Sequence, residues 1–111
     1  MRLLVVEDDL SIVDLLEITL SKYSPVIAMD LPTALSYLNA REFDLVVTDF
    51  HLTGSDTSLP VIARGYPTIL MSGGLKEEEM AQMLSTYPNL IAFIKKPFVL
   101  KELKAIISGL E

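Results

Sequence analysis

The chain has 111 residues, half of them hydrophobic, which suffices for one domain with a large core but not for two. It carries 15 acidic and 9 basic residues, and the formal net charge of -6 disfavours direct binding to nucleic acid. Cysteine is absent, which excludes disulfides and thiolate metal sites. No apolar run has the length of a membrane helix or the pattern of a signal peptide. We therefore expect one cytoplasmic domain over residues 1–111 that makes no membrane contact.

Five apolar runs predict the strands of a sheet. In chain order they cover residues 3–6, 25–29, 45–48, 68–71 and 90–94. Segments with helical periodicity lie between and after these runs. They cover residues 10–21, 32–40, 76–86 and 99–108. Strands that are apolar throughout and alternate with helices indicate a parallel sheet covered by helices on both faces.

The ends and inner faces of two helices can also be predicted. Asp9 is a suitable N-cap for the first helix, and Gly109 is a suitable C-cap for the last. Helical spacing predicts that the first helix faces the core with Ile12, Leu15, Leu16, Thr19 and Leu20. The same spacing predicts that the last helix faces it with Val99, Leu103, Ile106 and Ile107.

The segment 53–66 has the weakest pattern. It contains Gly54, Pro60 and Gly65, which interrupt helical periodicity. Its core-directed residues are expected to be Val61, Ile62 and Ala63. We expect a helix of at most two turns that begins near Pro60.

Charged or polar residues follow four of the five strands. Glu7 and Asp8 follow the first strand, Asp49 follows the third, Ser72 follows the fourth, and Lys96 follows the fifth after Lys95. In parallel sheets ligands bind beyond the carboxyl ends of the strands. A carboxylate such as Asp49 at the end of a buried strand is costly unless a charged or polar group meets it. The sequence therefore predicts a site at this edge of the sheet.

The residue types at these strand ends favour one kind of chemistry. Glu7, Asp8 and Asp49 offer only oxygen ligands, which favours Mg²⁺ or Mn²⁺. Lys96 adds a compact positive charge, and Ser72 adds a hydroxyl donor. These groups suit transfer of a phosphoryl group to a carboxylate, with Asp49 as the nucleophile.

At this point the chain resembles the receiver domains of two-component response regulators, including chemotaxis regulators. The resemblance covers nearly the whole chain, and four motifs carry it in order: Val5-Val6-Glu7-Asp8-Asp9, Phe43 to Asp49, Leu70-Met71-Ser72-Gly73 and Phe93 to Phe98. It implies an α/β, flavodoxin-like, doubly wound fold with five parallel strands in the order 2-1-3-4-5. The altered segment 53–66 implies a short or irregular third helix.

The resemblance also implies roles for single residues. Asp49 matches the phosphoacceptor, Asp8 a direct metal ligand, and Glu7 a ligand that acts more through water. The backbone carbonyl of His51 matches the third protein ligand of the metal, and Lys96 matches the lysine of the Lys-Pro-Phe motif. Lys95 competes for the lysine role, but adjacency to Pro97 favours Lys96.

Five positions match family positions with roles in switching, in a cis peptide bond or in dephosphorylation. Ser72 matches the switch hydroxyl, Phe93 the switch aromatic, and Pro97 the proline of a cis Lys-Pro bond. His51 and Gly74 occupy positions that tune dephosphorylation. The chain departs from the family where Thr53 replaces a frequent proline.

The resemblance implies a partner and a response. A histidine kinase or histidine phosphotransfer protein would phosphorylate Asp49, and the face formed by segments 76–86, 90–94 and 99–108 would then change for a downstream protein or effector domain. The domain would be no enzyme beyond accepting the phosphoryl group and hydrolysing it. An alternative is a receiver-like interaction module that no longer switches, which the altered segment 53–66 favours.

Other interpretations fit the residues less well. An aspartyl-phosphate hydrolase needs a second acid where this chain has His51, together with a cap domain that 111 residues cannot hold. A flavin-binding module would place a phosphate against Glu7 and Asp8, which would repel it. Taken singly, Asp49 could be a capped structural acid, Ser72 a helix cap, and Phe93 an ordinary core residue.

Overall fold

Five parallel strands form one sheet in the order β2-β1-β3-β4-β5, which confirms the predicted fold class. The structure is a computed structural model, and it describes residues 1–96 and 100–111. The strands are β1 (Leu3–Val6), β2 (Val26–Ala28), β3 (Leu45–Asp49), β4 (Thr68–Ser72) and β5 (Leu90–Lys95). Each observed strand overlaps a predicted apolar run, because strands of a parallel sheet that is covered on both faces are apolar throughout.

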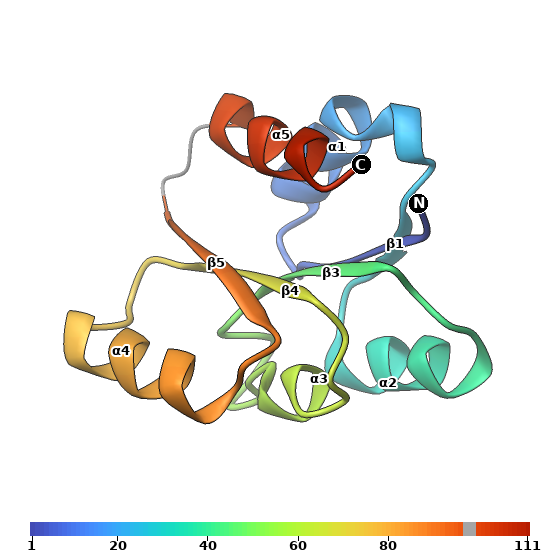
Figure 1. The fold of residues 1–111 in the computed structure, drawn as a ribbon. Helices are drawn as coiled ribbons and strands as arrows, with labels where there is room; N and C mark the ends of the chain where they lie inside the picture. The colour runs from blue at the N-terminus through green and yellow to red at the C-terminus, as the bar shows by residue number, and fades with distance from the viewer. Residues whose placement is uncertain (97–99) are drawn as a thin grey trace.

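Helices cover both faces of the sheet (Figure 1). They are α1 (Leu10–Thr19), α2 (Leu31–Ala40), α3 (Leu59–Ile62), α4 (Glu77–Thr86) and α5 (Leu100–Gly109). Helices α1 and α5 lie on one face, whereas α2, α3 and α4 lie on the other. Within the described ranges, no helix is both long enough and apolar enough to cross a membrane.

Alternate residues of each inner strand belong to different cores. In β1, Leu3 and Val5 belong to a cluster shared with α1 and α5, whereas Leu4 and Val6 belong to a cluster shared with α2. All four are buried. Successive side chains along a strand point to opposite faces of the sheet. This alternation determines to which face the side chains at each strand end point.

Capping residues begin α1 and α2, and acidic residues occupy the first turn of α4. The Asp9 side chain accepts a hydrogen bond from the Ser11 amide at 3.0 Å, which confirms the predicted N-cap of α1. Asp30 caps α2 in the same way through the Thr33 amide. Helix α4 begins with three glutamates, whose charges favour the positive end of the helix dipole.

The third helix is short, as predicted. It spans Leu59–Ile62 with Pro60 in its first turn, and Val61 and Ile62 are buried. The chain then reverses at Gly65, whose φ of 88° is a conformation that favours glycine. The prediction that Ala63 faces the core was wrong, because the helix ends before it and leaves it exposed.

The structure corrects other predictions for the helices. Val13 rather than Leu15 is buried in α1, because Leu16, Leu20 and Val13 form a narrower stripe that excludes Leu15. The helix ends at Thr19, and a 3₁₀ turn over Ser21–Tyr23 follows it. Gly109 is the last residue of α5 rather than its C-cap. The expected inner residue Val99 lies outside the described residues.

The packing of α1 can be tested with two neighbouring leucines. Leu16 is fully buried, whereas Leu15 is 50% exposed. We expect Leu16→Ala to lower the free energy of unfolding by about 2–5 kcal/mol, because it removes buried methyl groups and leaves a cavity. The matched control Leu15→Ala should change it by less than about 0.5 kcal/mol. Urea unfolding followed by circular dichroism measures both, and equal losses would contradict the assigned helix face.

Candidate functional site

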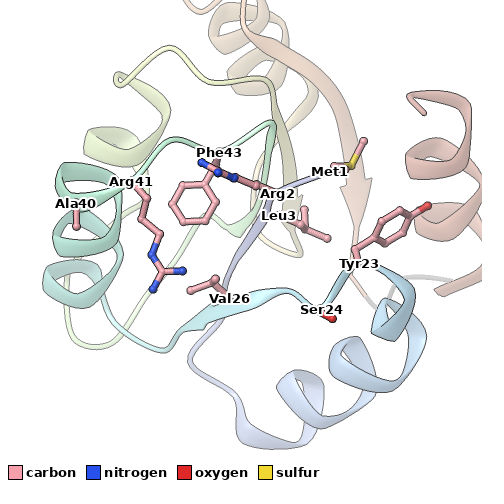
Figure 2. Close-up of a pocket in the computed structure, with 9 residues that line it drawn as sticks. All are labelled: Met1, Arg2, Leu3, Tyr23, Ser24, Val26, Ala40, Arg41 and Phe43. Carbon is pink, nitrogen blue, oxygen red and sulfur yellow. The ribbon is translucent and has the colours of Figure 1, made fainter.

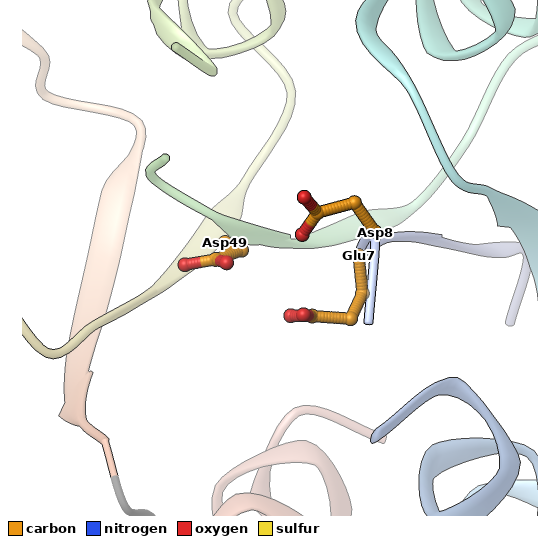
Figure 3. A group of neighbouring side chains, drawn as sticks. All are labelled: Glu7, Asp8 and Asp49. Carbon is orange, nitrogen blue, oxygen red and sulfur yellow. The ribbon is translucent and has the colours of Figure 1, made fainter. Parts of the chain in front are cut away.

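Four side chains from three strand ends meet at one edge of the sheet. Glu7 and Asp8 directly follow β1, Asp49 is the last residue of β3, and Lys96 directly follows β5. The pairing of Val6 with Thr48 brings the ends of β1 and β3 level. Figure 3 shows the carboxylates of Glu7, Asp8 and Asp49 gathered at these strand ends. The structure thus brings together the residues that the sequence predicted to form a site.

Lys96 joins two of the carboxylates. Its Nζ lies 2.9 Å from Oε2 and 3.2 Å from Oε1 of Glu7, and 3.0 Å from Oδ2 of Asp49. The side chain of Glu7 is fully buried, and those of Asp49 and Lys96 are 11% and 19% exposed. Lys95, its neighbour in the sequence, is exposed, so Lys96 is the lysine of the site.

Burial and the sharing of one ammonium between two carboxylates shift the pKa of Glu7 and of Lys96. Burial raises the pKa of the Glu7 carboxyl, and the hydrogen bond from Lys96 offsets this only in part because the charge of Asp49 raises the pKa further. Burial alone would lower the pKa of Lys96, but hydrogen bonds to Glu7 and Asp49 outweigh it and raise that pKa. The ammonium is stabilised by two carboxylates, whereas each carboxylate has only a share in one ammonium.

Asp8 completes a cluster that can hold a cation. One carboxylate oxygen from each of Glu7, Asp8 and Asp49 lies within 4.8 Å of the others. Three ionised carboxylates and one ammonium leave an excess of two negative charges. Because every donor atom is a carboxylate oxygen, the residues fit a hard divalent ion such as Mg²⁺ or Mn²⁺.

Two contacts within this cluster were missed by the sequence analysis. The hydroxyl of Thr53 donates to Oδ2 of Asp8 at 3.4 Å, and the amide of Asp9 donates to Oε1 of Glu7 at 3.3 Å. Thr53 was noted only as a departure from the family pattern. Thr53 lies four residues after Asp49, in the loop after β3, which lies beside the loop after β1. This position in the sequence could have indicated the contact with Asp8.

Ser72 ends β4 and is 5% exposed. Its hydroxyl oxygen accepts hydrogen bonds from the amides of Gly74 and Leu75, both at 3.3 Å. Its carbonyl oxygen accepts a hydrogen bond from the Lys96 amide at 2.9 Å. The hydroxyl is therefore tied to the loop that follows its own strand rather than to Asp49.

His51 and Gly74 lie next to each other above the strand ends. A Cβ atom at Gly74 would lie 3.5 Å from Nε2 of His51, which is an ordinary van der Waals contact, so the loops after β3 and β4 meet at these two residues. His51 is exposed, and its ring meets Phe50 edge-on with centroids 4.9 Å apart. The effects of His51 and Gly74 on dephosphorylation, and the use of the His51 carbonyl as a ligand, stay predictions.

Phe93 lies in β5 and is half-buried. It packs against the cluster formed by Phe50, Ile62, Leu70 and Leu90. This places it two strands away from Asp49, with β4 between them, and its role as a switch stays a prediction. The predicted cis bond before Pro97 lies outside the described residues.

The chain matches no protein-family model and no curated protein sequence. It is similar to the signal receiver domain of an HD domain-containing protein from Pseudomonas fluorescens Pf-5, with 26% identity and a TM-score of 0.81 over 97% of this chain and 84% of that one. The receiver domain of NtrX from Brucella abortus has 27% identity and a TM-score of 0.77, with 97% and 96% covered.

A third structure supports the fold alone. Chemotaxis response regulator CheY4 of Vibrio cholerae has 18% identity and a TM-score of 0.83, with 99% of this chain and 98% of that chain covered. Together with the first two structures, it confirms the predicted resemblance to response regulator receiver domains. The five-strand topology that the resemblance implied is the one observed.

Metal binding at the carboxylate cluster can be tested directly. We expect Mg²⁺ to shift the amide resonances of the loops after β1 and β3, and Asp8→Asn to raise the Kd for Mg²⁺ about tenfold, or ~1.4 kcal/mol. The reason is that the variant removes one charged ligand from the cluster. Asp14→Asn, at an exposed position of α1, is the control and should leave the Kd unchanged. Equal affinity in all three proteins would place the ion elsewhere.

Proposed function

We propose that this receiver domain, which extends over residues 1–111 in the cytoplasm, accepts a phosphoryl group on Asp49. The donor is a histidine kinase or a histidine phosphotransfer protein. The observation that carries the proposal is the contact of Lys96 with Asp49 and Glu7, with Asp8 beside them. These groups are the ones that phosphoryl transfer to a carboxylate requires.

The proposed chemistry needs no strong base. An oxygen of the ionised Asp49 carboxylate attacks phosphorus, and the bond from phosphorus to the donor's imidazole nitrogen breaks. The imidazole keeps the bonding electrons and takes up a proton. Lys96 neutralises charge on the phosphoryl oxygens because its Nζ already lies 3.0 Å from Asp49. Bound Mg²⁺, held by Glu7, Asp8 and Asp49, would supply further positive charge at the same oxygens.

The same residues support hydrolysis of the phosphoryl group. Asp49 is 8% exposed, so water can reach its carboxylate. The small Gly74 would leave the site open to water, and the ring of His51, which lies next to Gly74, would shield the site or orient that water. We propose no enzymatic activity beyond this acceptance and hydrolysis of a phosphoryl group.

Phosphorylation would act as a switch. Ser72 would leave the amides of Gly74 and Leu75 and donate its hydroxyl hydrogen to a phosphoryl oxygen, and Phe93 would move into the space it vacates. The face formed by α4, β5 and α5 would then change for a downstream protein or effector domain. To move such an equilibrium from 1:99 to 99:1, the phosphoryl group must favour one state by roughly 5.5 kcal/mol.

Phosphorylation can be tested with acetyl phosphate and Mg²⁺. We expect mass spectrometry to find one added phosphoryl group, located by peptide mapping at Asp49, because Asp49 contacts Lys96 and, unlike the fully buried Glu7, is partly exposed. Asp49→Asn should accept none, since an amide is a poor nucleophile. The control Asp56→Asn, in the exposed loop after β3, should be labelled like the natural chain. Labelling of the Asp49→Asn protein would contradict the proposal.

The second candidate function is a receiver-like interaction module that does not switch. The observation that favours it is the reduced third helix, four residues long, beside the loop that carries Thr53. A module of this kind would keep the carboxylate cluster as a structural feature. It would present its outer faces to a partner without a phosphorylation-dependent change.

Beryllofluoride distinguishes the two functions because it imitates a phosphoryl group on a carboxylate. With Mg²⁺ present, a switching domain should show amide shifts at Ser72 and Phe93 as well as at Asp49. These shifts arise because the Ser72 hydroxyl must exchange its present partners for the new group. Nuclear magnetic resonance is the suitable method, since the chain has no tryptophan. Shifts confined to the loops after β1 and β3 would favour the inert module.

A further inference from the structure

A pocket lies at the edge of the sheet opposite to the carboxylate cluster. Its volume is about 470 Å³, and its lining comes from the segments that precede β1, β2 and β3. Figure 2 shows these side chains around the hollow, with Arg41 on one side and Val26 below. A volume of this size is typical of sites for small molecules.

The charge of this pocket is opposite to that of the chain. Arg2 and Arg41, two of the three arginines in the sequence, line it, and no acidic residue does. The chain as a whole has 15 acidic residues and a net charge of -6. A pocket whose charged side chains are both arginines, in a chain with a negative net charge, indicates a site for an anion.

Two acidic residues near this edge, Glu111 and Asp44, already have other partners. Glu111 pairs with Lys22 at 3.2 Å, and Asp44 accepts a hydrogen bond from the backbone amide of Arg2 at 2.6 Å. Across residues 1–96 and 100–111, neither the Arg2 nor the Arg41 guanidinium forms a salt bridge with a carboxylate. Both guanidinium groups can therefore bind an anion without first releasing an acid.

Two local features prepare the pocket for a ligand. The guanidinium of Arg41 stacks over the ring of Tyr37, 5.4 Å from its centroid, which limits the freedom of a long side chain. Ser24, which also lines the pocket, ends the 3₁₀ turn in the left-handed conformation, with a φ of 48° and its amide bonded to the Ser21 carbonyl. This turn fixes the backbone of Ser24 beside the pocket.

We propose that this pocket binds a small organic phosphate monoester. The guanidinium forks of Arg2 and Arg41 would hold the phosphate oxygens, since this geometry suits bidentate binding of phosphate. The hydroxyl of Ser24 supplies a further donor. Val26 and Phe43 offer apolar surface to the organic part of the ligand. The four residue-to-residue steps from Leu3 to Glu7 span roughly 13 Å of strand, so this ligand does not reach the carboxylate cluster.

The test is a titration of the untagged chain with phenyl phosphate, followed by amide resonances in the presence of EDTA. We expect saturable shifts at Arg2, Ser24, Val26 and Arg41 with a Kd of about 1 mM, a usual affinity for so small a ligand. Arg41→Ala should raise the Kd about tenfold, and Arg41→Lys less. Arg64→Ala is the matched control, because Arg64 is exposed, bonds to Asn39 and lies outside the pocket.

Each other outcome overturns the proposal. The absence of saturable shifts up to about 10 mM would exclude the site, and equal weakening by Arg64→Ala would show unspecific attraction of anions. Benzoate that binds as tightly as phenyl phosphate would show that the pocket does not select a phosphate. EDTA and the absence of a phosphodonor keep Asp49 out of the experiment, so its failure leaves the proposed function unaffected.

Discussion

The contact of one ammonium with two carboxylates constrains most of this structure. Glu7 is fully buried, and such a group is tolerated only beside a cation or a hydrogen-bond donor. Lys96 supplies this partner from 89 residues away in the sequence. The contact forms only if β1, β3 and β5 end at the same edge, because a slip of one residue would turn a strand's side chains to the other face. The register of the sheet therefore determines the geometry of the site.

In the proposed function, the same contact lets the site accept both a cation and a phosphoryl group. Lys96 neutralises part of the charge of Glu7 and Asp49, and Asp8 adds a third carboxylate within reach. The remaining negative charge would attract a hard ion, and the ammonium would stay available to oxygens that bind to Asp49. Loop residues border this centre, since Thr53 contacts Asp8 and His51 meets Gly74.

Much of the fold could be predicted because burial imposes strong patterns. Continuous apolar runs located the strands, and the residues that follow them located the carboxylate cluster. Leu15 was misplaced because it lies about 100° around the helix from Leu16, which put it at the margin of a stripe that Val13 completes instead. The Thr53–Asp8 contact, the partners of Ser72 and the Arg2–Arg41 pocket could not be predicted, because they depend on loop conformations that leave no periodic signal.

We propose that Glu7, Asp8, Asp49 and Lys96 form one centre for a divalent ion and a phosphoryl group. A crystal structure with Mn²⁺ and beryllofluoride is the decisive test, because the anomalous signal of Mn²⁺ locates the ion. We expect the ion at oxygens of Asp8 and Asp49, with Lys96 Nζ in contact with fluorine. Mn²⁺ bound away from both carboxylates, or beryllofluoride absent from Asp49, would rule out such a centre.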